Sequence, residues 1–270
     1  GILMEYKQLK EDACRYVDEL KTLIYDIADK LHARPELGQE EFFASALLKD
    51  ILTDHGFTLD NPVSDAFPTA FHGTFGSGPF QMGFLAEYDA LPKIGHGCGH
   101  NLIAAMSIGA ALAFAKAAGE KATVHVYGCP AEETVGSKVY MSEHGVFDDL
   151  HAAVIVHPGV DNTYISGTSY ATHPLQFTFL GKAAHVADTE YHGINALDAL
   201  VDFYGRLKEY EKTLTERHII GAIITDGGTA PNIVPDRAVL KATIRALTVD
   251  YLEYKMLPDI KKMAQDVAAA

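Results

Sequence analysis

Three apolar segments with the character of β-strands each run directly into side chains of the kinds that bind metal ions. The segments are residues 81–87, 123–127 and 152–156, and the side chains that follow are Asp89 with the loop 95–100, the pair Glu132 and Glu133, and His157. In an open parallel α/β sheet, ligands bind beyond the carboxyl ends of the strands. We therefore expect the three groups of side chains to converge in one crevice.

The segments around these strands alternate between strand and helix patterns. A strand-like segment at 69–75 comes first, and a helical run at 102–118 lies between the first two strands named above. Apolar residues spaced by three and four predict an amphipathic helix over 17–31, and a second helix begins at about Glu40. This alternation predicts an α/β fold with a mostly parallel sheet.

After Pro158 the pattern changes to strands and helices in the order β, α, β, β, α. The predicted elements lie at 175–180, 194–207, 218–225, 236–247 and 251–270. This order is one strand short of the ferredoxin-like α+β arrangement. We therefore expect two domains, residues 1–165 and residues 166–270.

Charge and composition disfavour several classes of partner. A net charge of −14 would repel nucleic acid and anionic membrane surfaces, so a small-molecule substrate becomes the default. The opening segment is rich in charged residues, and no later stretch is apolar long enough to span a bilayer. Three scattered cysteines do not make a disulfide framework, which suits a reducing compartment. A soluble cytoplasmic protein is expected.

Cys98 and His100 lie two residues apart in a glycine-rich loop. This spacing lets a thiolate and an imidazole turn toward one ion, and the glycines remove steric obstacles. An isolated Cys-x-His pair is more often a tight turn with a buried cysteine, so the neighbouring strand ends decide the interpretation. On spacing alone His96 competes for a place at the ion, and His157 is equally well explained as a core or capping residue.

Glu132 and Glu133 follow a strand as adjacent carboxylates. Neighbouring side chains of an extended chain point in opposite directions, so one can bind metal while the other faces the substrate. A carboxylate beside an activated water takes its proton and passes it to the leaving amine. The alternative is a solvated helix start, where acidic residues are common. In this setting the pair favours one ligand and one general base.

The second domain carries three further candidates. His185 follows the segment 181–184, Asn232 lies in the turn 230–235, and Arg245 lies on the last predicted strand. Each also has an ordinary structural explanation, because turns favour Asn and an exposed strand position suits Arg.

Taken together, these segments resemble the aminoacylase and carboxypeptidase G type of two-metal peptidases, and most closely the branch of indoleacetyl-amino-acid hydrolases and aminobenzoyl-glutamate hydrolase. The resemblance covers nearly the whole chain. The motifs that carry it are residues 32–38 (HARPELG), 87–92 (EYDALP), 97–101 (GCGHN), 130–133 (PAEE), 157–158 (HP), 181–185 (GKAAH), 193–197 (GINAL) and 230–235 (APNIVP).

The resemblance implies a metallopeptidase catalytic domain with an inserted lid and dimerisation domain. The implied roles are metal binding by Cys98, His100, Glu133 and His157, general-base catalysis by Glu132, and support of the ligands by Asp89. On the lid, His185 would reach the partner subunit's site and stabilise the oxyanion, while Asn232 and Arg245 would bind the substrate carboxylate. Segment 32–38 is assigned a structural role, because helix termination explains Pro35 and Gly38.

Two residues depart from the family pattern. Glu87 stands where broader relatives have a metal-binding histidine, which supports the branch that uses Cys98. Asn101 stands where this branch typically has Asp, which points toward the aminobenzoyl-glutamate and dipeptide hydrolases.

The implied function is hydrolysis of an amide bond in N-acyl amino acids, aminobenzoyl-glutamate or similar small amides, by water activated at two divalent ions. Zinc, manganese and cobalt all suit ligands of mixed S, N and O type. A homodimer through the lid domain is also implied. The alternatives are a dipeptidase or carboxypeptidase acting on ordinary peptides, and a non-catalytic binding protein, which the presence of Glu132 disfavours.

The resembling enzymes return from the lid to the catalytic domain, where a late histidine supplies one more metal ligand. No histidine follows Ala246 here, and the lid domain lacks a closing strand. The chain is therefore expected to lack the C-terminal part of its catalytic domain, and a protein that ended at Ala270 would bind one of the ions weakly and hydrolyse little.

Overall fold

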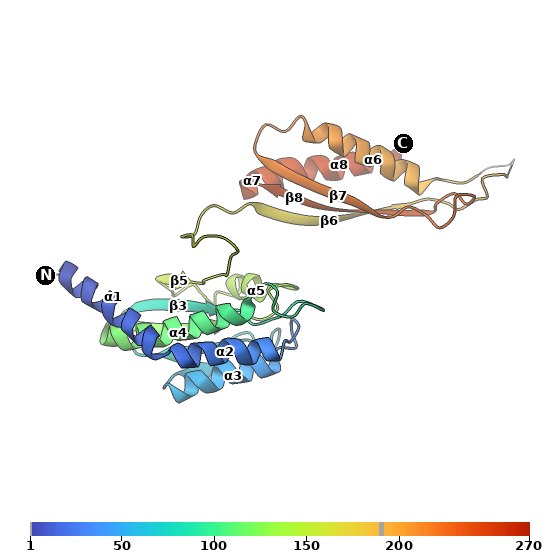
Figure 1. Cartoon of the computed structure of the whole chain (residues 1–270). Coiled ribbons are helices and arrows are strands. Elements are labelled where there is room, and N and C mark those ends of the chain that lie inside the picture. The colour runs from blue at the N-terminus through green and yellow to red at the C-terminus, as the bar shows by residue number, and fades with distance from the viewer. Residues whose placement is uncertain (1, 189–191) are drawn as a thin grey trace. The chain divides into compact units, whose positions relative to one another are not determined.

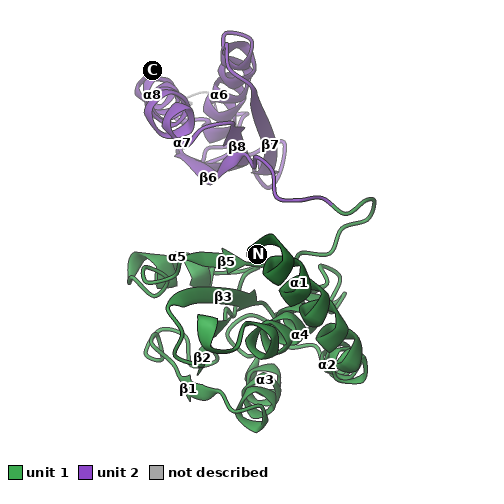
Figure 2. Cartoon of the chain, turned by 90° about the vertical axis from the view of Figure 1, so that its left-hand side faces the viewer, with its two compact units in different colours: residues 1–163 green, residues 164–270 purple. Residues whose placement is uncertain are grey.

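The structure is a computed structural model, and it describes residues 2–188 and 192–270. The polypeptide divides into two compact units, residues 1–163 and residues 164–270 (Figure 2). Each unit has its own β-sheet and its own apolar core.

The first unit is built on a five-stranded sheet in the order β1-β2-β4-β3-β5. Its strands are β1 (Thr58–Asp60), β2 (Phe71–Phe75), β3 (Phe80–Ala86), β4 (Ala122–Gly128) and β5 (Ala152–Val154). β3 runs parallel to β4 and β5, whereas β2 is antiparallel to β1 and to β4. The α/β fold is confirmed, but the sheet is mixed, and its parallel part is β4-β3-β5.

The direction of β2 follows from its short connection to β3. Only residues 76–79 join the two strands, whereas a parallel pair needs a crossover of a dozen or more residues. β2 and β3 therefore run in opposite directions on either side of β4. The sequence pattern missed β1, which is only three residues long.

Helices cover one face of this sheet (Figure 1). They are α2 (Lys21–Ala33), α3 (Phe42–Asp54) and α4 (His100–Ala118). Their apolar side chains, among them Leu48 and Ile108, pack with Val124 and Val126 of β4 in one continuous core. The single helix predicted over 17–31 is instead two helices, α1 (Ile2–Glu19) and α2, which meet at Leu20.

Helix α4 corrects one expectation. The stretch His100–Lys121 is long and apolar enough, by length and composition, to cross a membrane, although no such segment was expected. A helix that is hydrophobic all round is either a membrane span or the core helix of a larger protein. Here 56% of the apolar window is buried inside the protein, where α4 is the central helix of the first core.

The opposite face of the sheet is covered by a smaller apolar cluster. Phe67, Tyr127 and Met141 belong to it, and Met141 lies on the short helix α5 (Ser137–Glu143). Both faces of the central strands are therefore buried. This fixes the carboxyl ends of β3, β4 and β5, from which the candidate site residues extend.

The second unit is a three-stranded antiparallel sheet in the order β6-β8-β7. Its strands are β6 (Ala171–Leu180), β7 (His218–Asp226) and β8 (Arg237–Ala246). Two helices pack on one face of the sheet (Figure 1), and a π-helical segment, Leu252–Met256, leads into the second of them. The helices of this unit are α6 (Ala196–Glu211), the single turn α7 (Val249–Tyr251) and α8 (Leu257–Ala269). The predicted order β, α, β, β, α is confirmed.

Candidate metal centre

His100 is the fixed point of the site. It is the first residue of α4, its side chain is fully buried, and its Nδ1 lies 2.9 Å from Asp89 Oδ1 and 2.8 Å from the Asp89 carbonyl oxygen. Both neighbours are acceptors, so Nδ1 carries the proton and donates it. The lone pair of a neutral ring is then on Nε2, which is how histidine ligands are oriented in metal sites.

Three carboxylate oxygens surround this lone pair. Oε2 of Glu87 lies 3.2 Å from His100 Nε2, and Oε2 of Glu132 and Oε1 of Glu133 each lie 3.6 Å from it. Within the described residues, Glu87 Oε2 and His100 Nε2 are buried and have no hydrogen-bond partner. When the ring is neutral, groups that only accept thus face one another, which is unfavourable unless a cation lies between them. A second ring proton is the other way to relieve this: burial lowers the pKa of His100, but Asp89, Glu87 and Glu132 outweigh it and leave this pKa raised.

The spacing of these atoms fits a divalent ion. Ligands at 2.0–2.2 Å from a tetrahedral ion are separated by roughly 3.3 Å, and an Sγ at 2.3 Å stands roughly 3.6 Å from an imidazole nitrogen on the same ion. The 3.2 Å between Glu87 and His100 and the 3.5 Å from Cys98 Sγ to His157 Nε2 agree with these values. The donor set therefore suits metal binding on geometry as well as on residue type.

Cys98 lies beside both histidines. The ligand atoms of Cys98, His100 and His157 all lie within 4.8 Å of one another. Burial, a hydrogen bond with Glu133 and the surrounding carboxylates raise the pKa of the Cys98 thiol to about 11. A bound divalent ion would reverse this, since it deprotonates a coordinating thiol.

The loop around Cys98 needs its glycine. Gly99 has φ +85°, and a Cβ at this residue would stand 2.8 Å from Pro158 Cγ. The left-handed conformation and the close approach of Pro158 both favour glycine. Gly99 thus allows the Cys98 loop to lie against the segment that carries His157.

Glu132 and Glu133 lie in a turn and not in extended chain. The expectation that their side chains point in opposite directions, as in a strand, is therefore wrong. Ala131 has φ +57° and turns the backbone, so both carboxylates approach His100. Glu41 accepts a hydrogen bond of 2.7 Å from the Ala131 N–H, and Asp89 accepts one of 3.0 Å from the Glu133 N–H. These bonds hold the turn against Asp89, which follows β3, and against Glu41, which precedes α3.

The two glutamates differ in exposure and charge. The side chain of Glu132 is 40% exposed and that of Glu133 is 25% exposed. Burial, Glu87 and Glu133 raise the pKa of Glu132, which makes it a better proton acceptor than an ordinary carboxylate. Burial also raises the pKa of Asp89, but hydrogen bonds from His100 and Glu133 outweigh it and leave this pKa lowered.

The structure thus brings together all four residues predicted to bind metal, with Glu132 and Asp89 beside them. His96 does not belong to any metal-type cluster among the described residues, and burial lowers its pKa. Sequence reasoning missed Lys138, whose ammonium group forms an ion pair with Glu87. Glu87 itself was noted only as a departure from a family pattern.

Segment 32–38 does more than end a helix. The Ala90 N–H donates to the Glu36 carbonyl at 2.7 Å, beside Asp89. A Cβ at Gly38 would stand 2.6 Å from Thr134 Oγ1 and 3.2 Å from Ala131 Cα. The structural role predicted for this segment therefore includes support of the loops that carry Asp89 and Glu132.

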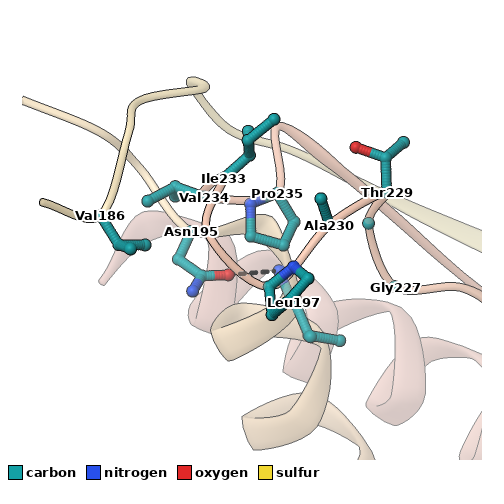
Figure 3. Close-up of a pocket in the computed structure, with 11 residues that line it drawn as sticks. Val186, Asn195, Leu197, Gly227, Thr229, Ala230, Ile233, Val234 and Pro235 are labelled. Carbon is teal, nitrogen blue, oxygen red and sulfur yellow. Dashed lines mark hydrogen bonds between the residues drawn. The ribbon is translucent and has the colours of Figure 1, made fainter.

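In the second unit, two loops bring His185 and Asn232 together. His185 pairs with Ile233 in an isolated bridge, and the Val186 N–H donates to the Asn232 carbonyl at 3.1 Å. These loops line a cavity of about 680 Å³ (Figure 3). Asn195, also in this cavity, accepts hydrogen bonds from the N–H groups of Leu197 and Asp198 and so caps α6.

Arg245 lies elsewhere on the second unit. It is exposed on β8 opposite Thr172 and Ile219, whereas the loops with His185 and Asn232 adjoin the other end of the strand, at Arg237. The eight residue steps from Arg237 to Arg245 span roughly 27 Å at about 3.4 Å per residue. Within this unit the structure does not bring Arg245 to Asn232.

Comparison with known proteins relates the chain to M20 peptidases. Residues 174–267 match the peptidase dimerisation domain of M20 peptidases. The chain is 34% identical to the Xaa-Arg dipeptidase of Mus musculus, over 97% of the chain and 63% of that enzyme. It is 35% identical to a p-aminobenzoyl-glutamate hydrolase subunit of Escherichia coli K12, over 82% of the chain and 50% of that protein. Residues 174–267 are thus similar to the dimerisation domain of M20 peptidases, and most of the chain is similar to two hydrolases.

The fold comparison agrees with this similarity to M20 peptidases. A dinuclear metal-binding peptidase of the M20 family from Bacillus subtilis has the same fold, with a TM-score of 0.71 at 20% identity, over 93% of the chain and 71% of that protein. The predicted resemblance to two-metal peptidases, including the aminobenzoyl-glutamate hydrolase branch, is confirmed. The chain spans less than two thirds of the length of these two curated relatives.

Proposed function

We propose that this chain forms the metal-binding and lid portion of a hydrolase that cleaves amide bonds of small substrates. The observation that carries the proposal is the set of acceptor groups around His100 Nε2, with Cys98 and His157 beside it. Such a set suits divalent ions and leaves an exposed carboxylate, Glu132, next to them.

Two divalent ions would be held mainly by Cys98, His100, Glu133 and His157, and when bound they would polarise an amide carbonyl and acidify water. Glu132 takes a proton from water and later delivers it to the leaving amine, and its raised pKa suits both steps. Asp89 keeps the His100 ring in the tautomer that presents Nε2. Zinc, manganese and cobalt remain candidates for the ions.

The substrates we propose are N-acyl amino acids, aminobenzoyl-glutamate or dipeptides. Similarity to the hydrolase from Escherichia coli supports the aminobenzoyl-glutamate class. Similarity to a Xaa-Arg dipeptidase over 97% of the chain supports the dipeptidase alternative. A non-catalytic binding protein is less well supported, because Glu132 is present and lies 3.6 Å from the His100 ring nitrogen.

We further propose that the second unit joins two subunits in a cytoplasmic homodimer. The match of residues 174–267 to a peptidase dimerisation domain supports the dimer. In such a dimer His185 of one subunit would stabilise the oxyanion in the other, and Asn232 and Arg245 would contact the substrate carboxylate.

A direct test combines metal binding with a hydrolysis screen. The purified full-length protein would be freed of metal, reconstituted with zinc, manganese or cobalt, and assayed with acyl amino acids, aminobenzoyl-glutamate and dipeptides. We expect stoichiometric metal binding, and hydrolysis that chelation removes. A folded protein that binds none of the three ions would overturn the proposal.

A further inference from the structure

Glu87 follows β3 and directs its two carboxylate oxygens to different partners. Oε1 accepts a hydrogen bond from the Lys138 ammonium group. Oε2 lies 3.2 Å from His100 Nε2 and, within the described residues, is buried without a hydrogen-bond partner. One oxygen is therefore fixed by a lysine, while the other is free to bind a cation.

The site contains two overlapping groups of metal-type ligand atoms. Cys98, His100 and His157 form one, and Glu87, His100 and Glu132 form the other, each with all atoms within 4.8 Å of one another. His100 belongs to both, but its Nδ1 is occupied by Asp89, and its single remaining nitrogen binds one ion. If each group holds an ion, the two positions are neighbours that meet at His100, and only one of the ions takes its Nε2.

Burial separates the roles of the two carboxylates in the second group. The side chain of Glu87 is 5% exposed, whereas that of Glu132 is 40% exposed. A general base must reach the water that attacks the substrate, which Glu132 can do. Glu87 is shielded from solvent and held by Lys138, as a permanent ligand should be.

We propose that Glu87 is a ligand of an oxygen-rich second metal position and that Lys138 positions its carboxylate. This rests on the proposed function, because it assumes that two ions are bound. The first position offers a thiolate and imidazoles, which favour softer ions such as zinc, whereas a carboxylate position favours harder ions such as manganese. The two positions should therefore differ in metal preference.

Lys138 is suited to this positioning role. It lies on α5, one residue after the helix begins, and its side chain is 29% exposed, so the ammonium group is partly shielded. Its bond to Oε1 turns Oε2 toward His100. An arginine at this position could keep the bond, whereas a methionine would keep the bulk and lose it.

The test measures two metals separately on the metal-free full-length protein. Manganese binding is followed by loss of the free-ion signal in electron paramagnetic resonance, and cobalt binding by the thiolate-to-cobalt absorption band. We expect Glu87→Gln to weaken manganese binding at least tenfold and to leave the cobalt–thiolate band intact. Cys98→Ser should abolish that band and spare manganese binding.

Matched variants complete the design. Glu143→Gln makes the same chemical change at an exposed position of α5 and should alter neither metal. Lys138→Met should weaken manganese binding, and Lys138→Arg should restore most of it. If Glu87→Gln fails to fold, as judged by circular dichroism, Glu87→Asp keeps the charge but withdraws the oxygen, and should weaken manganese binding in its place.

Two results would overturn the inference. The first is manganese affinity in a folded Glu87→Gln or Glu87→Asp variant equal to that of the wild type. The second is equal loss of manganese and of the cobalt–thiolate band in such a variant, which would mean a single position. If the wild-type protein bound neither ion, the proposed function would fail first, so the two failures are distinguishable.

Discussion

The two units hold their candidate functional residues in different ways. In the first unit His100 is fully buried, and Asp89 fixes both its ring and the N–H of Glu133. In the second unit His185 and Asn232 are exposed, and their loops are joined mainly through backbone hydrogen bonds. The metal-type residues are thus prearranged within one unit, whereas His185 and Asn232 lie exposed on loops. The same substitutions should therefore act differently in the two units.

The largest expected effect separates the two glutamates of the first unit. Glu132→Gln cannot accept a proton, so turnover should fall about a hundredfold or more while bound metal stays unchanged. Glu133→Gln should instead lower metal content. Kinetics together with metal analysis by mass spectrometry would check both variants. Equal metal loss in the two would contradict this division of roles.

His185 tests whether the second unit acts across a dimer. His185→Ala should lose most activity and keep its metal, because the residue belongs to the lid unit. Mixing it with Glu132→Gln under subunit exchange should restore part of the activity, since one site of each hybrid would be intact. Activity is measured on mixed dimers isolated by two affinity tags. No restoration in those dimers would show that His185 does not serve its neighbour.

For the first unit, the sequence predicted which residues form the site better than it predicted how they are arranged. Strand ends and motifs were enough to bring Cys98, His100 and His157 to one place, because the topology of β3, β4 and β5 determines where the loops go. The turn at Ala131 was missed, because a non-glycine residue with positive φ leaves little signal in a single sequence. Lys138 was missed because its pairing with Glu87 joins residues far apart in the chain.

For the second unit, the sequence predicted the helices and strands but not where the candidate residues lie. Alternation and helix periodicity predicted its elements, since one face of each strand is buried against α6 and α8. Asn232 and Arg245 lie near opposite ends of β8, which their motifs did not predict. Residues assigned to one role in a family need not be neighbours within one unit. A prediction for such residues therefore depends on the assembly.

Asp89→Asn tests whether Asp89 positions the metal-type residues of the first unit. The amide cannot accept from both the His100 ring and the Glu133 N–H without turning its NH₂ group toward a donor. Loss of a group that orients a metal ligand typically lowers metal affinity by about 10–100-fold. We expect a loss in this range by competitive chelator titration, with Asp149→Asn as the exposed control. Wild-type affinity in Asp89→Asn would argue against its positioning role.

Asn195→Ala is the matching change in the second unit. It removes the cap of α6, which typically costs about 1 kcal/mol of stability. Denaturant unfolding should show this loss, while metal affinity of the first unit stays the same. A change in metal affinity without loss of stability would mean that the loops of the second unit influence the metal site.

The smallest expected effect concerns pH and a histidine pair on the sheet of the first unit. His72 Nε2 and His125 Nδ1 lie 2.8 Å apart, and His125 Nε2 lies 2.6 Å from Gln81 Oε1. Because the Gln81 oxygen accepts from Nε2, the Nδ1 of a neutral His125 can only accept. His72 Nδ1 faces Asp60 Oδ1 at 2.8 Å, so His72 donates to His125 from Nε2 when its ring carries both protons. A proton added to His125 would remove this hydrogen bond.

Burial and the neighbouring His72 lower the pKa of His125, and the charge of Asp149 opposes them only in part. The unfolded chain gains this proton near the ordinary histidine pKa of about 6.5, before the folded protein does, so the contribution of His125 lowers stability as the pH falls below that value. His125→Gln should therefore flatten the stability curve between about pH 6.5 and pH 5, measured by denaturant unfolding, because glutamine does not titrate there. His144→Gln, an exposed histidine at the end of α5, is the control. If the wild-type and His125→Gln curves ran parallel through this range, the histidine pair would not be a source of pH sensitivity in the first unit.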